Sequence, residues 1–441
     1  MATAFNILFA GATFAAIVAF LRMRTGVFFI AANAAIALRA FANIAQFGQP
    51  DSQSFLPRGL FSEARLESAA WIFVIVVPLS LLFAILPSPP ATHGRKQPAP
   101  NLPPLPRWVL ILLALYFLVY IASMRTILAG AYASEGQIRF EAPAGGVQAL
   151  MVGLVTYELY RRVRDAGMSP FTAFAILAGL FLLTDYSKGA TGFATGFLLN
   201  GAFLFFSTRT TARRRLLPLV CIVLTIATLA LVIRAVRQRL HDDGTEVLAS
   251  ATSGLVTAET DRERNAEGIE ERCNGAQIAA HTLECVWLYE SGHDRGWRSL
   301  YNPILYTFQP AFLLKALDMT RPREAAWELG DYFIHGGGIF VFGELYWNGG
   351  YFCVFSMTLA LLLTTWYVDV SRYRSIAALV LACQFTPALL QGTQYGVAYG
   401  IRGLSNGLIA LLILKLLNYA RRRVPIATPE LTGDRLRGPA E

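Results

Sequence analysis

The chain is poor in charge. Of its 441 residues only 15% are Asp, Glu, Lys or Arg, whereas 55% are hydrophobic and the mean hydropathy is +0.46. A soluble domain carries about 25% charged residues. One globule of this size has too little interior to hide so many apolar side chains. The composition therefore excludes a disordered chain, a collagen-like repeat and an ordinary water-soluble enzyme, and it predicts an all-α polytopic membrane protein.

Motifs that would hold a metal ion or a nucleotide are also missing. The five cysteines form no C-x-x-C, no D-x-D occurs, and no G-K-[ST] follows the glycine-rich stretch near residue 337. The one E-x-D, at 259–261, lies in a charge-laced segment that is typical of a solvated surface. We expect no metal and no cofactor. Whether Cys273 and Cys285 form a disulfide stays open and depends on the compartment that they face.

The charges that are present are segregated along the chain. Residues 235–337 hold 16 acidic and 10 basic residues, a balance of −6, and the remainder carries +15. Taken whole, the net charge of +9 would suit a nucleic-acid binder. Segregation of this kind is instead what membrane topology produces, so we expect no nucleic-acid partner.

Apolar runs predict about eleven membrane spans. They lie at 4–21, 26–46, 69–86, 108–128, 146–160, 171–186, 189–206, 216–234, 343–367, 375–395 and 400–417. No base precedes Arg22, so the first run is expected to be a span rather than a cleaved signal. The apolar segment 301–318 is broken by Pro303 and Pro310, and we interpret it as interfacial or re-entrant.

The basic residues fix an expected orientation. Every second connection between the predicted spans is rich in bases. These connections contain Arg22/Arg24, Arg95/Lys96/Arg107, Arg161/Arg162/Arg164, Arg209 with 213–215, Arg372/Arg374 and the tail at 421–423. The positive-inside rule makes these connections cytoplasmic, the N-terminus periplasmic and the C-terminus cytoplasmic. The predicted organisation is an N-terminal bundle (1–234), a large periplasmic loop or cap (235–337), C-terminal transmembrane helices (338–420) and a cytoplasmic tail (421–441).

Ionisable residues gather at the opposite, outer end of the predicted spans. They are Arg39, Arg125, Asp185, Lys188, Arg234, Glu344 and Arg402. A charge near the centre of a membrane helix costs about 2.5–3.5 kcal/mol on insertion scales. Taken singly, each base can snorkel to the headgroups, and Asp185 with Lys188 can form a local ion pair. Taken together, they favour a ligand with several negative charges, because Arg suits bidentate phosphate contact.

A second feature is HGGGIFVFGELYWNGGYF at 335–352. Spacings of four and three would place Glu344, Asn348 and Tyr351 on one helix face. Glu344 or His335 is sufficient for one general base, and the sequence leaves both open. In the run 375–395, Gln391 shares a face with two further glutamines, an arrangement that often only joins helices.

The order of these features resembles the Wzy-type oligosaccharide repeat-unit polymerases of O-antigen and exopolysaccharide synthesis. The resemblance rests on Ser187-Lys188-Gly189, on Arg234 before the long loop, on GGG…GE-x-Y-x-N-x-G (Gly336 to Gly350) and on Arg402-Gly403. It implies a metal-independent membrane glycosyltransferase of GT-C-like fold in the bacterial inner membrane. Together with the charges and helix faces described above, the resemblance makes Glu344 and His335 the catalytic candidates. The residues expected to bind the diphosphate are Arg234, Arg402, Lys188, Arg125 and Arg39. Those expected to bind glycan or to support the site are Tyr346, Asn348, Tyr351 and Gln391.

The resemblance also implies partners: an undecaprenyl-diphosphate-linked oligosaccharide, membrane lipids and a chain-length regulator protein. Two other functions stay open. An O-antigen ligase would share the polytopic form and the long outer loop. A flippase or transporter of lipid-linked oligosaccharide would perform no chemistry, and its charges should line a path through both leaflets.

Overall fold

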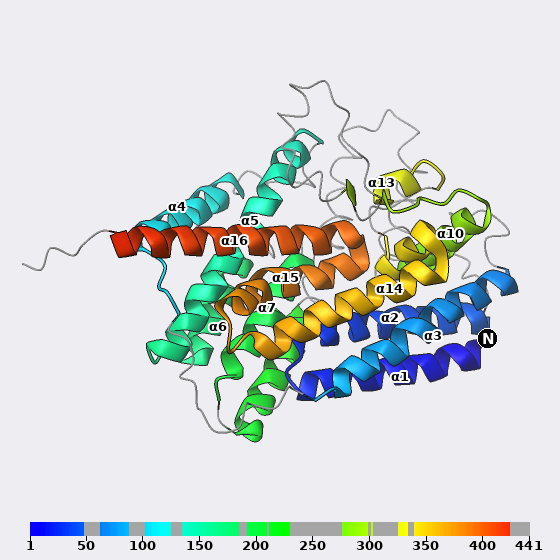
Figure 1. Ribbon diagram of the computed structural model, residues 1–441, viewed down its shortest axis with the longest axis horizontal. Helices are drawn as coiled ribbons and strands as arrows, with labels where there is room; N and C mark the ends of the chain where they lie inside the picture. Colours follow the sequence, from blue (N-terminus) through cyan, green and yellow to red (C-terminus); the bar gives the residue numbers. More distant parts are fainter. Residues whose placement is uncertain are drawn as a thin grey trace, which may run out of the picture.

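The computed structural model is a bundle of helices (Figure 1). It describes residues 1–47, 62–87, 102–124, 135–184, 192–209, 211–229, 276–298, 301–302, 325–333 and 339–423, and among these no residue is in a β-strand. The helices are α1 (Ala2–Leu21), α2 (Thr25–Phe47), α3 (Glu63–Ile85), α4 (Arg107–Met124), α5 (Glu135–Asp165), α6 (Pro170–Thr184), α7 (Gly192–Phe206), α10 (Ala276–Glu290), α13 (Ala325–Leu329), α14 (Val341–Ser371), α15 (Ile376–Tyr395) and α16 (Val397–Arg423). Residues 212–229 are also helical.

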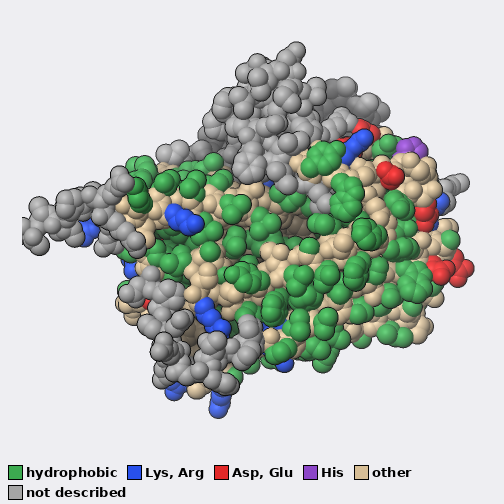
Figure 2. All heavy atoms as spheres, in the orientation of Figure 1, with side chains coloured by type: hydrophobic (Ala, Val, Ile, Leu, Met, Phe, Trp, Pro, Cys, Tyr) green, Lys and Arg blue, Asp and Glu red, His purple; other side chains and the backbone are tan. Residues whose placement is uncertain are grey.

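The helices confirm an all-α membrane protein. Each apolar run predicted as a span is helical over its described residues, apart from the terminal residues Leu86 and Ser375, which flank α3 and α15. Five helices are long and apolar enough to cross a membrane by length and composition: α1, α2, α3, α14 and Val397–Tyr419 of α16. Large apolar side chains are exposed along these helices, among them Phe14, Phe352 and Leu412, and they cover much of the face in Figure 2. Such a surface suits lipid rather than water.

Two apolar cores build the bundle. The first joins α1, α2, α3, α10 and α14, where the ring of Phe41 lies 5.6 Å from that of Phe73. The second joins α4 to α7, the helix at 212–229, α15 and α16, where Phe181 and Phe197 lie 5.9 Å apart. α15 packs against α2 and α14 as well as α5, α7 and α16, so it connects the two cores.

Helix α10 is part of the bundle although it comes from the predicted cap at 235–337. It packs on α14, α2 and α3, and Leu283, Val286 and Leu288 on it are buried. The approach to α14 is close, because a Cβ at Gly343 would lie only 2.9 Å from the Cα of Thr282. The cap therefore contributes a core helix next to the start of α14.

α14 is broken near its start. Gly350 adopts φ +61° and ψ −155°, a conformation that L-residues rarely adopt, and the helix changes direction at Gly349 and Gly350. A regular helix predicts a face shared by Glu344, Asn348 and Tyr351, and this prediction is wrong for Tyr351. Helical spacing does not continue through the two glycines, so Tyr351 belongs to the second segment of α14.

Candidate functional site

Glu344 is enclosed where α14 meets α16. Glu344 is 2% exposed, and its Oε2 accepts a hydrogen bond of 2.8 Å from the backbone N–H of Val397, the first residue of α16. The first N–H groups of a helix have no partner within the helix and attract negative charge, which explains why a carboxylate is held there. The turn before α16 needs Gly396, which has φ +100°. A Cβ at Gly396 would lie 2.5 Å from Oε2 of Glu344.

Arg295 links Glu344 to the cap. Arg295 is 3% exposed, donates two hydrogen bonds of 2.6 and 2.9 Å to the carboxylate of Glu328, and lies 3.9 Å from Oε1 of Glu344. Its guanidinium also lies over the ring of Trp347 at 5.5 Å, and its backbone N–H donates to the Trp347 carbonyl. The arginine therefore joins α13, the chain after α10, and α14 through one buried charge network.

Two buried titratable side chains lie on α10, and one of them, Cys285, is close enough to Glu344 and Arg295 to feel their charges. Glu284 is buried, and burial raises the pKa of its carboxyl to about 8. Cys285 is a buried free thiol whose pKa is raised by burial first, then by the charges of Glu284 and Glu344, and is opposed by Arg295. At neutral pH the Glu284 carboxyl keeps its proton.

Arg402 is brought to the same end of α16. It follows Val397 by five residues, about 7.5 Å along the helix axis. Its side chain is half-buried, and its guanidinium lies 5.2 Å from the centre of the Tyr399 ring. One helix end thus presents both the backbone N–H that holds Glu344 and a predicted phosphate-binding arginine.

Tyr346, Asn348 and Tyr351, the predicted glycan-binding or structural residues of α14, all contact protein groups. The buried Tyr346 ring lies 4.9 Å from the rings of both Tyr289 and Tyr351. Asn348 donates a 2.6 Å hydrogen bond to the carbonyl of Glu344. Tyr351 is partly exposed and donates to the carbonyl of Ser68 at 3.4 Å. Tyr351 is therefore the one of these three whose side chain reaches the surface.

The structure describes little or nothing of the contacts of the other predicted site residues. Arg39 is exposed on α2, and Gln391 lies in α15 with its side chain outside the described part of the structure. The remaining candidates lie outside the described residues: His335, Lys188, Arg125 and Arg234. Cys273, the possible disulfide partner of Cys285, lies outside them too.

Sequence reasoning missed Arg295, Glu328 and Glu284. All three come from the predicted cap, where charged residues are common and no fixed spacing distinguishes a buried one from a solvated one. Burial is the distinguishing property. The only available signal was the apolar content of 276–290, which is too short for a span and is interrupted by His281 and Glu284.

The described residues contain no cluster of three or more His, Cys, Asp or Glu side chains that could hold a metal ion. Comparison of the chain with models of protein families, with curated proteins and with solved structures finds no match.

Proposed function

We propose that the protein is a membrane glycosyltransferase of the Wzy type, which joins oligosaccharide repeat units carried on undecaprenyl diphosphate. The observation that carries the proposal is the junction of α14 and α16. There a buried carboxylate, Glu344, is held by the first N–H of α16, and Arg402 follows in the second turn of the same helix. A carboxylate can serve transfer from a diphosphate as the general base, and a guanidinium can stabilise the leaving diphosphate. About eleven spans, a GT-C-like fold and a periplasmic N-terminus belong to the same proposal.

In the proposed reaction a sugar hydroxyl of the acceptor attacks the anomeric carbon of the donor. The bond from that carbon to the diphosphate oxygen breaks, and undecaprenyl diphosphate leaves with the electron pair. Glu344 or its rival His335 takes the proton of the attacking hydroxyl. Arg402, with Arg234, Lys188, Arg125 and Arg39, stabilises the charge that develops on the leaving diphosphate.

The contacts of Glu344 bear on its role. Val397 and Arg295 approach different oxygens of the carboxylate, so the side chain is held in one orientation. A base that is oriented before the substrate arrives loses no freedom in the reaction. We assign Arg295 and Glu328 as positioning residues, because they reach the substrate only through Glu344 or through the fold of the cap.

The direct test is polymerisation by the purified protein. The protein is incubated with one defined lipid-linked repeat unit, with and without EDTA, and the products are sized on a gel. We expect a ladder of two or more units on the lipid carrier, unchanged by EDTA.

The rival functions give different products. A ligase would leave the single unit unextended and would transfer it only when lipid A core is added. A flippase would move the lipid-linked unit across vesicles and form no glycosidic bond. Either result would contradict the proposal.

A further inference from the structure

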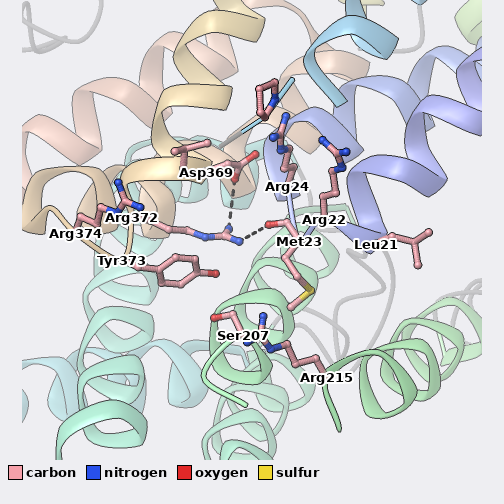
Figure 3. Close-up of a pocket in the computed structure, with 12 residues that line it drawn as sticks. Leu21, Arg22, Met23, Arg24, Ser207, Arg215, Asp369, Arg372, Tyr373 and Arg374 are labelled. Carbon is pink, nitrogen blue, oxygen red and sulfur yellow. Dashed lines mark hydrogen bonds and ion pairs between the residues drawn. The ribbon is translucent and has the colours of Figure 1, made fainter. Parts of the chain in front are cut away.

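A polar cavity of about 740 Å³ lies at the other end of α14, away from Glu344 (Figure 3). Its walls come from the turn between α1 and α2, the C-terminal end of α14 with the turn that follows it, and the start of the helix at 212–229. Pro87 after α3 and Ser207 after α7 complete the lining. Half of the twelve residues that line it are charged: Arg22, Arg24, Arg215, Arg372, Arg374 and Asp369. The volume lies within the range of about 300–1,000 Å³ that small-molecule sites occupy.

The lining carries much more positive than negative charge. Asp369 is the only carboxylate among the described residues that line the cavity. It is already engaged, since its Oδ1 lies 3.3 Å from Nη1 of Arg372 and its Oδ2 accepts a 3.0 Å hydrogen bond from the N–H of Gly26. Five guanidinium groups therefore share one carboxylate within the lining.

The two innermost arginines are held in place by the fold. Arg24 is 4% exposed and donates to the carbonyl oxygens of Phe83 and Leu86, which are neutral. Burial, and next the charge of Arg22, hold the pKa of Arg24 below its usual value. Arg372 is 2% exposed, and its Nε has no hydrogen-bond partner in the structure. The neutral carbonyl acceptors satisfy the donors of Arg24 but do not balance its charge, so within the described lining Arg24 and Arg372 have only the Asp369 carboxylate between them, and unbalanced charge is costly for buried groups.

We propose that this cavity binds a phosphate-bearing anion. Arginine guanidinium groups match the oxygens of a phosphate in charge and in geometry. The rim adds an apolar side, because Leu21 also lines the cavity and is 54% exposed at the end of α1. An acidic phospholipid headgroup and a soluble phosphate compound share the chemistry that this site recognises, and basic pockets between membrane helices are known to bind such headgroups. The inference is independent of the proposed glycosyltransferase activity.

A matched pair of double variants tests the site. The cavity variant is Arg215→Gln with Arg374→Gln, which leaves the buried Arg24 and Arg372 in place. The control variant is Arg213→Gln with Arg214→Gln, two exposed residues on the same helix as Arg215 that are not part of the lining. Both variants remove two positive charges. If the cavity variant does not fold, Arg374→Gln alone is compared with Arg214→Gln alone.

Thermal unfolding of the full-length protein in detergent gives the readout. One arm adds phosphatidylglycerol or, for comparison, phosphatidylcholine, and a second arm adds inorganic diphosphate without lipid. We expect one of the two anions to raise Tm by several degrees in the unaltered protein and in the control variant, and at most half as much in the cavity variant. A rise with phosphatidylglycerol alone identifies a lipid headgroup, and a rise with diphosphate identifies a soluble anion. No rise with either anion, or equal rises in both variants, would overturn the proposal.

Discussion

The carboxylate of Glu344 and the backbone N–H of Val397 form a 2.8 Å hydrogen bond that ties the first turn of α14 to the first residue of α16. This bond brings two parts of the chain that are 53 residues apart to one place. The preceding residue, Gly396, has room only for a hydrogen atom on the side of Glu344. The geometry of the candidate site therefore depends on one glycine as well as on its charged groups.

Gly396→Ala should lower stability more than a matched change elsewhere. Gly292→Ala is the control, because Gly292 also has positive φ, +78°, but nothing lies within 4 Å of its added Cβ. Both variants should lose about 1–3 kcal/mol because an L-residue is strained at these positive φ values. Gly396→Ala should lose about 1–3 kcal/mol more, since its Cβ meets Glu344 and Ile339. Unfolding in denaturant measures both, and equal losses would show that the turn does not press on Glu344.

Arg295→Ala should destabilise the cap strongly. The change leaves Glu328 and the buried Glu344 without their guanidinium partner, and breaking a buried pair from one side costs about 3–5 kcal/mol. Arg298→Ala is the control, because Arg298 is an exposed arginine three residues further on. A double-mutant cycle with Glu328→Gln separates the pair from its surroundings. A Tm for Arg295→Ala that matches that of Arg298→Ala would contradict the network.

Glu284→Gln should change how stability depends on pH. Burial raises the pKa of Glu284 from 4.5 to about 8, so the folded protein holds a proton that the unfolded chain releases. Its contribution to stability is complete below about pH 4.5 and is lost as pH rises towards 8. The glutamine variant lacks this loss, so it should exceed the parent protein in Tm at pH 8 and show a flatter profile.

The control for that profile is Glu67→Gln, at an exposed glutamate of α3. Tm is measured from pH 4.5 to 8.5 for the parent protein and the two variants. Subtracting one Tm curve from another cancels the effect of groups that titrate in all three proteins. If the Glu284 and Glu67 variants follow the same curve, Glu284 is not buried as the structure describes.

Gly343→Ala should loosen α10 from α14. The added Cβ would lie 2.9 Å from the Cα of Thr282, which is backbone and cannot rotate away. Gly179→Ala on α6 is the control, because its Cβ meets nothing within 4 Å and Ala favours a helix over Gly by about 1 kcal/mol. Hydrogen exchange over residues 276–290 should accelerate in Gly343→Ala only. Unchanged exchange there would contradict the close helix contact.

The helical architecture could be predicted from the sequence, because a long apolar segment in a membrane can satisfy its own backbone hydrogen bonds only as a helix. Every predicted run is helical where it is described, except at the terminal residues Leu86 and Ser375, and five helices have the length and composition of a span. α10 was not readable, since a 15-residue helix with internal His281 and Glu284 looks like any loop segment. Its burial depends on Gly343, which lies 61 residues beyond Thr282 in the chain.

Part of the candidate site was also readable. The GGG…GELYWNGG pattern pointed to Glu344, and a late Arg-Gly pair pointed to Arg402; the structure places both at the start of α16. The kink occurs at two consecutive glycines, Gly349 and Gly350, which are visible in the sequence. The prediction of a shared face nevertheless assumed regular helical spacing across them. Arg295 was not predictable, because nothing local separates it from the exposed arginine at 298.

The most direct test of the proposed transfer site is the length of the polysaccharide made in cells that supply this protein's own repeat unit. Arg402→Ala is compared with Lys415→Ala, an exposed base on the same helix, at matched amounts of membrane-inserted protein. Loss of one group that stabilises a leaving anion costs roughly 100-fold in rate. We predict single lipid-linked units in place of long chains for Arg402→Ala and a normal distribution for Lys415→Ala. Normal chain lengths from Arg402→Ala would contradict a diphosphate held at the start of α16.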